Sequence, residues 1–204
     1  YYTDSFSVVD VGAGSAKVTT LALGPQQPLT AQRKGEMLFN DAHLCFQKWQ
    51  SCASCHPDGR ADALNWDLLN DGIGNPKNTK SMLLAHRTPP AMITAVRPDA
   101  ESAVRAGFRH ILFAVSEEAD SVAIDQYLSG LKAMPSPHLV DGRLSAVATR
   151  GKAVFERARC AGCHEGSLLT DMQQYDVGTA GGLDEGTKFD TPSLVEAWRP
   201  GPYL

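Results

Sequence analysis

Two copies of one short motif constrain this chain more than any other feature of its sequence. Each copy reads Cys-x-x-Cys-His, first at residues 52–56 and again at residues 160–164. This spacing is the attachment signature of a c-type haem, in which both cysteines form thioether bonds and the histidine becomes an iron ligand. The sequence therefore predicts two covalent haems. The residues that would hold them are Cys52, Cys55 and His56 for the first haem and Cys160, Cys163 and His164 for the second.

Zinc binding and thiol redox chemistry are the alternatives for paired cysteines. Structural zinc sites usually place their two Cys-x-x-Cys pairs about 15–20 residues apart, whereas these pairs lie more than a hundred residues apart. A thioredoxin-like motif requires a βαβ setting, which the flanking sequence does not show. A helix-compatible Gly-x-x-x-Phe precedes each motif, at residues 35–39 and 151–155. The repeated context favours haem attachment at both places.

Composition and charge add limits on the class of protein. The chain has 204 residues, a formal charge of −4 and 43% apolar residues, as expected for one or two globular domains. We expect no nucleic-acid partner, and no apolar run approaches the roughly 18 residues of a membrane span. Covalent haem attachment normally takes place outside the cytoplasm. The chain begins at Tyr1 without Met, so we expect a mature or trimmed protein of the periplasm or cell surface.

The first 28 residues differ from the rest of the chain. Two runs rich in β-branched residues, 5–11 and 16–23, flank a glycine-containing segment, which is a β-hairpin signal. A lone hairpin is marginally stable in water, so we expect this one to lean on another part of the protein. Its Val-Val-Asp stretch at residues 8–10 resembles part of a YVTN-type β-propeller blade. That resemblance implies the end of a larger propeller-containing protein, or a strand pair fixed against a haem domain.

Three helices are predicted before the second motif. The first should run from Thr30, which can cap it, to about Phe39. A second helix is expected over about residues 98–113. A third is expected over about 116–132, where apolar residues recur at helical spacing. The proline-rich residues 134–137 then form a linker. The fifth cysteine, Cys45, has no obvious partner, and we expect it to be a buried small apolar residue.

These elements resemble a known family. A Gly-x-x-x-Phe helix, a Cys-x-x-Cys-His motif and a later helix with a Tyr-Leu-x-x-Leu face at residues 127–131 resemble class I cytochrome c. Two such units in tandem resemble the bacterial di-haem cytochrome c peroxidase and MauG superfamily. The supporting stretches are Asp67–Asn75, Thr88–Pro90, Phe189–Leu194 and Ala197–Leu204. The resemblance covers about residues 30–204.

The resemblance implies a mainly α fold built from two tandem cytochrome c-like haem units. Residues 1–28 would form a β-hairpin arm, residues 29–140 the first haem domain and residues 141–204 the second. Only 40 residues follow His164, so we expect the second unit to be incomplete. The far-side ligand of its haem, a Met or Tyr in this superfamily, is then expected beyond Leu204.

The far side of the first haem has three candidate ligands, His86, Met82 and Met92. All three lie between the first motif and the next predicted helix, where a distal loop should sit. His86 is the preferred candidate because imidazole is a standard iron ligand. The alternative for His86 is a hydrogen bond to a haem propionate. The two methionines are more often core fillers than ligands.

The resemblance implies further site residues. The superfamily places a tryptophan between its two haems, and Trp66 is the candidate electron relay here, with simple packing as the alternative. Some members hold calcium between the units. Asn75 and Thr191 are candidate ligands, since amide and carbonyl oxygens suit that ion.

The peroxide-binding face is where this sequence departs from the family. Arg97 matches the family arginine, but Val104 stands at the position of the family glutamine. Glu101 could act as the acid–base group that assists O–O cleavage. The alternative for Glu101 is simple compensation of the helix dipole. Peroxidase activity is therefore open even if the fold is correct.

The leading prediction is a peroxidase-like or MauG-like oxidoreductase. Its second haem would receive electrons from a small cytochrome or cupredoxin, and Trp66 would bridge to the first haem. The first haem would react with peroxide or oxidise a protein partner. One alternative is a pure electron-transfer module with two six-coordinate irons. Another is a propeller-based binding protein with vestigial haems. An open haem face would favour the enzyme.

Overall fold

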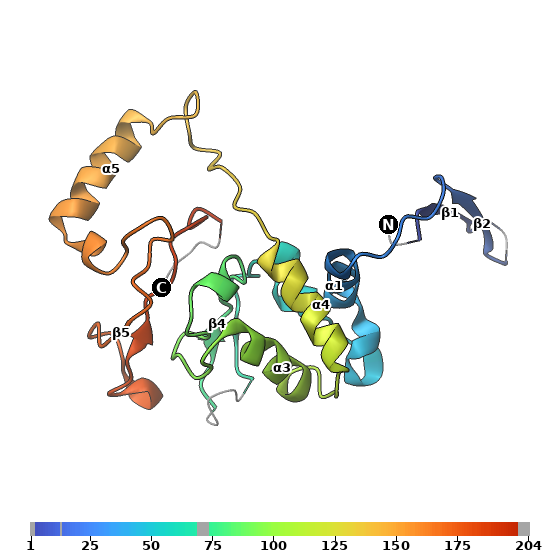
Figure 1. Cartoon of the computed structure of the whole chain (residues 1–204), viewed down its shortest axis with the longest axis horizontal. Helices are drawn as coiled ribbons and strands as arrows, with labels where there is room; N and C mark the ends of the chain where they lie inside the picture. The colour runs from blue at the N-terminus through green and yellow to red at the C-terminus, as the bar shows by residue number, and fades with distance from the viewer. Residues whose placement is uncertain (1–2, 13, 69–73, 200–204) are drawn as a thin grey trace.

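The computed structural model describes residues 3–12, 14–68 and 74–199, and Figure 1 shows an elongated arrangement of three parts. A hairpin lies at one end, a group of helices in the middle, and one further helix with irregular segments at the other end. The hairpin consists of β1 (Ser5–Asp10) and β2 (Lys17–Ala22). The α-helices are α1 (Ala31–Asn40), α2 (Cys52–Cys55), α3 (Ala100–His110), α4 (Glu118–Ser129) and α5 (Ala146–Arg157).

The crossing of α1 and α4 organises the middle part. Helix α1 begins after Thr30, whose side chain accepts a hydrogen bond from the Arg33 amide, so the predicted cap is confirmed. Gly35 faces α4 so closely that an added Cβ would lie 1.8 Å from the carbonyl oxygen of Ala123. Only glycine permits this approach of two helix backbones. One turn later, the rings of Phe39 and Tyr127 meet with centroids 5.3 Å apart.

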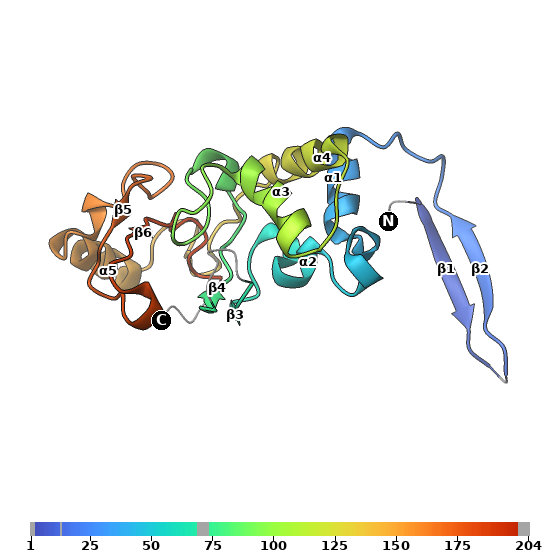
Figure 2. The ribbon, with the colours of Figure 1, turned by 90° about the horizontal axis from the view of Figure 1, so that it is seen from below.

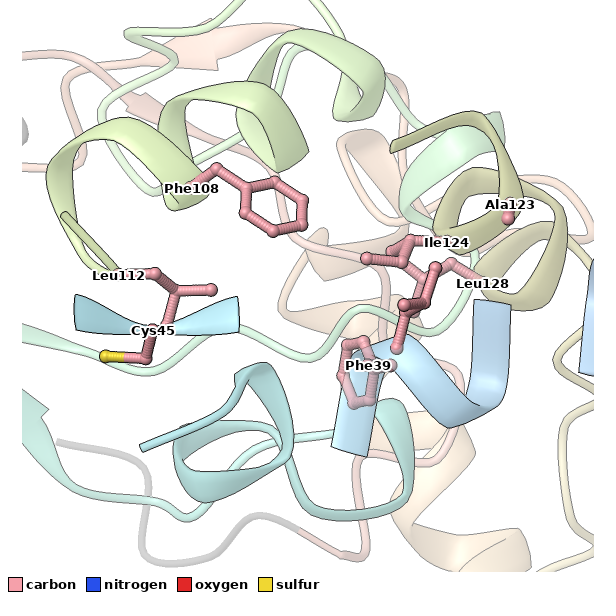
Figure 3. Close-up of a cluster of buried hydrophobic side chains, with 8 residues drawn as sticks. Phe39, Cys45, Phe108, Leu112, Ala123, Ile124 and Leu128 are labelled. Atoms are coloured by element: carbon pink, nitrogen blue, oxygen red, sulfur yellow. The ribbon is translucent and has the colours of Figure 1, made fainter. Parts of the chain in front are cut away.

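A single apolar cluster fills the space between α1, α3 and α4 (Figure 3). Phe39 and Ile124 are each 1% exposed, and Phe108 and Leu112 close the cluster from the α3 side. Cys45 is also buried against this cluster, which confirms its predicted role as a small apolar residue. The crossing helices and α3 therefore form a rigid base beside the first motif.

Helices α3 and α4 are shorter than the sequence predicts. Helix α3 begins after Asp99, whose carboxylate accepts from the Ser102 amide at 2.7 Å, and it ends at His110. Helix α4 covers Glu118–Ser129. The predicted spans ran to residues 113 and 132 because apolar residues continue past each helix end. Those residues pack from irregular backbone instead, as Leu112 does.

The rest of the described chain consists of short turns and small sheets. Strand β3 (Asn65–Trp66) pairs antiparallel with β4 (Lys77–Asn78), and β5 (Gln174–Tyr175) pairs with β6 (Phe189–Asp190). Two-residue strands leave no alternation for a sequence pattern to reveal. The 3₁₀ turns are η1 (Ala42–Leu44), η2 (Phe46–Lys48), η3 (Pro57–Gly59), η4 (Ala85–Arg87), η5 (Cys160–Gly162) and η6 (Gly182–Asp184).

The fold is accordingly mixed rather than clearly mainly α. In the part of the chain that the structure describes, five α-helices accompany three separate two-stranded sheets. The predicted hairpin is confirmed, with antiparallel pairing from Ser5 opposite Ala22 to Asp10 opposite Lys17. Figure 2 shows the hairpin projecting away from the helices. An ion pair of 2.7 Å between Asp4 and Arg33 ties its base to α1.

Helix α5 precedes the second motif as α1 precedes the first. It begins after Ser145, whose side chain accepts from the Ala148 amide. A Cβ added to its Gly151 would meet no atom of another segment within 4 Å, in contrast to Gly35. Within the described ranges, no helix is both long and apolar enough to cross a membrane.

Candidate haem sites

The first Cys-x-x-Cys-His motif is held by the single helical turn α2. The Ser51 amide donates to the Ser54 hydroxyl at 3.0 Å, which fixes the start of this turn. Cys52 and Cys55 lie three residues apart, on one face of the helix. The turn therefore presents both thiols in one direction, as two attachment points on one ring require.

His56 is oriented by a backbone carbonyl. Its Nδ1 lies 2.9 Å from the carbonyl oxygen of Arg60. Because a carbonyl only accepts, Nδ1 carries the proton and Nε2 keeps the lone pair that an iron ligand needs. Burial lowers the pKa of His56, which favours the neutral, ligating form.

The thiols of the first motif lie in an apolar environment. Burial raises the pKa of Cys52 to about 12 and raises the pKa of Cys55 as well. A reactive or zinc-binding cysteine needs the thiolate form, which such surroundings oppose. All five cysteines are free of disulfides. No group of three or more His, Cys, Asp or Glu side chains in the described ranges is arranged to hold a metal ion by itself. The site suits thioether attachment better than zinc.

The second motif repeats the same arrangement. Turn η5 brings the His164 amide to the Cys160 carbonyl at 3.0 Å. The Nδ1 atom of His164 lies 3.1 Å from the carbonyl oxygen of Leu169, so Nε2 is again left for iron. The ring of Phe155, from the preceding helix, lies 6.4 Å from the His164 ring. Both motifs therefore fit a covalent haem.

His86 stands out among the other predicted ligands. It lies in η4, and its Nε2 is 3.0 Å from a carboxylate oxygen of Asp125 on α4. Asp125 also accepts from Arg105 on α3 at 2.7 Å. The carboxylate fixes the proton on Nε2. The Nδ1 atom is then the one buried side-chain nitrogen or oxygen without a hydrogen-bond partner in the described part of the chain. A buried, unpaired nitrogen needs an explanation, and a haem ligand or haem contact supplies one.

Trp66 lies on the surface near the first motif. It belongs to β3, and 42% of its surface is exposed. Its indole Nε1 donates to Asp62 at 2.8 Å, and the Asp62 amide donates to the Cys55 carbonyl at 3.0 Å. This chain of hydrogen bonds places Trp66 next to the haem attachment site. Its role as an electron relay stays a prediction.

Arg97 and Glu101 lie on either side of the start of α3. Arg97 is half-buried, bridges to Ala91 through its backbone and donates from its side chain to the Val96 carbonyl. Glu101 is exposed in the first turn of α3, where a negative charge stabilises the helix dipole. Within the described ranges, neither side chain forms a hydrogen bond or an ion pair with His86. Their catalytic roles stay predictions.

The side chains of the two proposed calcium ligands form hydrogen bonds with other residues of the chain. Asn75 donates to Asp184 at 2.8 Å, and the ammonium of Lys77 lies 3.0 Å from the other oxygen of that carboxylate. The Thr191 hydroxyl donates to the Gln173 carbonyl at 3.0 Å. A lysine thus already supplies positive charge at Asp184. A calcium ion between the units stays a prediction.

Several charged residues that lie at the site were not predicted from the sequence. Asp125 could have been found, because it falls on the same helical face as the apolar residues Ile124 and Leu128, where a charged side chain is not expected. Arg60 and Glu196 form a buried ion pair across 136 positions of sequence. No local pattern signals a pair that only the tertiary structure brings together.

Together, the fold and these sites define a cytochrome c-type haem protein. The features that do so are two thiol pairs on single turns, two carbonyl-oriented histidines, and the α1–α4 crossing beside the first motif.

Comparison with known proteins narrows this class. The chain is 30% identical over 228 aligned positions to hydrazine synthase subunit gamma of Kuenenia stuttgartiensis. The alignment covers 84% of this chain. The chain spans 65% of that relative's length. The solved structure of Kuenenia stuttgartiensis hydrazine synthase under xenon pressure matches with a TM-score of 0.75 and 25% identity, covering 98% of this chain and 85% of that one.

A second solved structure agrees on the fold. A MauG-like protein associated with microbial copper homeostasis matches with a TM-score of 0.64 and 19% identity, covering 89% of this chain and 72% of that one. No family model matches the chain. These similarities support a relationship to c-type cytochromes, which is the broader form of the resemblance inferred from the sequence, and the MauG-like structure shows a shared fold.

Proposed function

We propose that this chain is a di-haem c-type cytochrome that serves as the redox subunit of a hydrazine-synthase-like enzyme. The observation that carries the proposal is the common geometry of His56 and His164, each bonded through Nδ1 to a backbone carbonyl beside a thiol pair. Similarity to hydrazine synthase subunit gamma supports the role of a subunit. When bound, each haem supplies an iron that gains and loses one electron.

The two haems are carried by tandem cytochrome c-like units, residues 29–140 and 141–204, with residues 1–28 as an arm. In the first unit, Gly35 lets α4 cross α1. Gly151 is its counterpart on α5, and no such helix packs on it in the described ranges. The two glycines of the repeated Gly-x-x-x-Phe pattern therefore have different surroundings.

In the enzymatic form of the proposal, the first haem site reacts with peroxide or oxidises a partner. His56, oriented by the Arg60 carbonyl, would hold the iron, and His86, oriented by Asp125, would be a further ligand or contact of the same haem. The second site receives electrons from a donor such as a small cytochrome or cupredoxin, and Trp66 bridges the two sites. Arg97 and Glu101 assist at the first site.

The second candidate function is electron transfer without substrate chemistry. Two observations favour it. His86 is buried with an unpaired nitrogen, as a sixth ligand would be, and Glu101 is exposed rather than turned into the interior. Both functions place the protein in the periplasm or at the cell surface, because covalent haem attachment takes place outside the cytoplasm.

Haem attachment is tested by producing the chain in a bacterial host that matures c-type cytochromes, followed by intact mass measurement. We expect two covalent haems per chain and one in a C160S/C163S variant. A chain without covalent haem would end the proposal. Co-purification with the other subunits of hydrazine synthase tests the subunit role. Failure to associate would leave an independent cytochrome.

Enzyme and carrier are separated by the optical spectrum of the half-reduced holoprotein, with calcium present, before and after hydrogen peroxide is added. A high-spin haem that peroxide oxidises supports the enzyme, and two low-spin haems that do not respond support the carrier. An H86A variant should convert a low-spin first haem to high spin if His86 is the sixth ligand. The matched control is H43A, because the His43 side chain is 72% exposed and should leave the spectrum unchanged.

A further inference from the structure

Arg60 makes two kinds of contact that connect different parts of the molecule. Its carbonyl oxygen accepts the hydrogen bond from Nδ1 of His56. Its guanidinium forms a two-pronged ion pair with Glu196, with Nη2 at 2.9 Å from one carboxylate oxygen and Nε at 3.1 Å from the other. Glu196 lies 32 residues after His164, within the second haem unit. One residue therefore joins the first iron ligand to the second unit.

The ion pair is buried and highly constrained. The side chains of Arg60 and Glu196 are 11% and 4% exposed. Arg60 also donates to the carbonyls of Asp58 and Lys132, at 2.8 and 2.9 Å. Glu196 also accepts from the Met134 amide, in the linker between the units. Two-pronged arginine–carboxylate pairs have a fixed geometry. This one therefore leaves the Arg60 side chain little freedom to move.

Leu131 restricts the backbone next to Arg60. Gly59 has a φ of +67°, and a Cβ at this position would lie 2.5 Å from a methyl carbon of Leu131. The Arg60 amide donates to the Pro57 carbonyl at 2.9 Å. Leu131 thus supports this short loop from one side, and Glu196 holds it from the other. The position of the Arg60 carbonyl depends on both.

We propose that Glu196 is a positioning residue for the first haem, because it clamps the arginine whose carbonyl orients the proximal ligand His56. The inference rests on the proposed function, since it requires a haem at Cys52 and Cys55. Hydrogen bonding to the second nitrogen of a ligating histidine sets the ring orientation and the basicity of the ligand. Through this clamp, the second haem unit tunes the iron of the first.

A second ion pair provides a control that distinguishes the positioning of His56 from a general contribution to the association of the two units. Lys77 and Asp184 form another ion pair between the same two parts of the chain, at 3.0 Å and with side chains 21% and 22% exposed. In the described part of the chain, neither residue forms a hydrogen bond with His56. Loss of this pair should loosen the same interface without moving the Arg60 carbonyl.

The experiment is a potentiometric titration of the holoprotein, monitored by optical and electron paramagnetic resonance spectra. In the E196Q variant we expect two covalent haems by mass, a shifted midpoint potential for one haem and altered g-values for that haem alone. The E196D variant, which keeps the charge, should lie closer to the unaltered protein. The D184N control should shift neither haem.

A double-mutant cycle ties the shift to the first haem. The R60K variant keeps the backbone carbonyl but cannot form the two-pronged pair, so it should shift the same redox step as E196Q. The R60K/E196Q double variant should show about the same shift as either single variant, because both break one interaction. Additive shifts would contradict the clamp.

The outcomes distinguish this inference from the proposed function. Absence of covalent haem in the unaltered protein would overturn the proposed function. Two haems whose potentials and g-values are unchanged in E196Q would overturn only the clamp. An equal shift in D184N would also overturn it, because general loosening of the interface would then be the cause.

Discussion

At the scale of single residues, hydrogen bonding decides which nitrogen of each histidine keeps a lone pair that could bind a metal. His56 and His164 use Nδ1 to donate to carbonyls, and His86 uses Nε2 to donate to a carboxylate. The carboxylate is also held by Arg105. A histidine that is fixed in this way presents a lone pair at its remaining nitrogen. The three residues therefore share one property, a defined tautomer, although only two belong to the motifs.

Asp125 is predicted to stabilise the fold through this property. In a D125A variant the buried Nε2–H of His86 loses its acceptor, and Arg105 loses one of its two carboxylates. We expect the free energy of unfolding to fall by about 1–3 kcal/mol, the usual cost of a buried group left unpaired. Urea unfolding of the holoprotein measures this change.

The control for that prediction is E118Q. Glu118 is the other partner of Arg105, and its side chain is 70% exposed. Solvent screens an exposed pair, so E118Q should leave the unfolding midpoint unchanged. If E118Q and D125A were equally destabilising, the loss of Arg105 pairing rather than the His86 bond would be the cause.

At the scale of elements, the two Gly-x-x-x-Phe helices differ in what they contact. Gly35 allows α4 to cross α1, whereas Gly151 on α5 faces open space in the described ranges. The same sequence pattern therefore serves two different environments. Sequence similarity between the two helices predicts equal roles, but among the described residues Gly35 packs against another helix and Gly151 does not.

The different surroundings of Gly35 and Gly151 can be tested by replacing each glycine with alanine. G35A would place a methyl group 1.8 Å from the Ala123 carbonyl oxygen, so the helices must separate. We expect a loss of at least about 1–3 kcal/mol, the usual cost of overpacking. G151A adds a methyl group to an exposed helix position and should stabilise α5 by up to about 1 kcal/mol. Urea unfolding followed by circular dichroism compares them. Equal destabilisation by both would show that α5 is packed.

Much of the element order could be predicted from the sequence, for reasons that are local. Thr30 signals a helix start, the β-branched runs signal the hairpin, and the motifs themselves mark the haem sites. The sheets of two residues could not be predicted, because their pairing depends on distant segments such as β5 and β6. The position of Trp66 also depends on a non-local contact, because its strand β3 pairs with β4.

At the scale of the whole molecule, ion pairs join the first haem unit to the second. Arg60 pairs with Glu196, Lys77 with Asp184 and Lys80 with Asp190. These pairs place carboxylates of the second unit against cations that follow the first motif. The two units are therefore coupled by charge, and their association should depend on pH.

The pKa values of two of these carboxylates, Asp190 and Glu196, are shifted in opposite directions. Burial raises the pKa of Asp190 above its usual value, and Lys80 only partly offsets this effect. For Glu196 burial also acts to raise the pKa, but the hydrogen bonds from Arg60 and from the Met134 amide outweigh it and hold the pKa below 4.5. A lowered pKa means that the unfolded chain binds the proton more readily than the folded one.

We therefore predict that Glu196 stabilises the folded chain above about pH 4.5 and that this contribution is lost as the pH falls through the lower folded-state pKa. In E196Q, urea unfolding measured between about pH 3 and 6 should show a smaller loss of stability on acidification than in the unaltered protein. D190N should change the slope in the opposite sense, because the contribution of Asp190 is present at low pH and lost as the pH rises. If E196Q kept the slope of the unaltered protein, the Arg60–Glu196 pair could not be a source of acid sensitivity. The coupling of the haem units by charge would then depend on the Lys77–Asp184 and Lys80–Asp190 pairs.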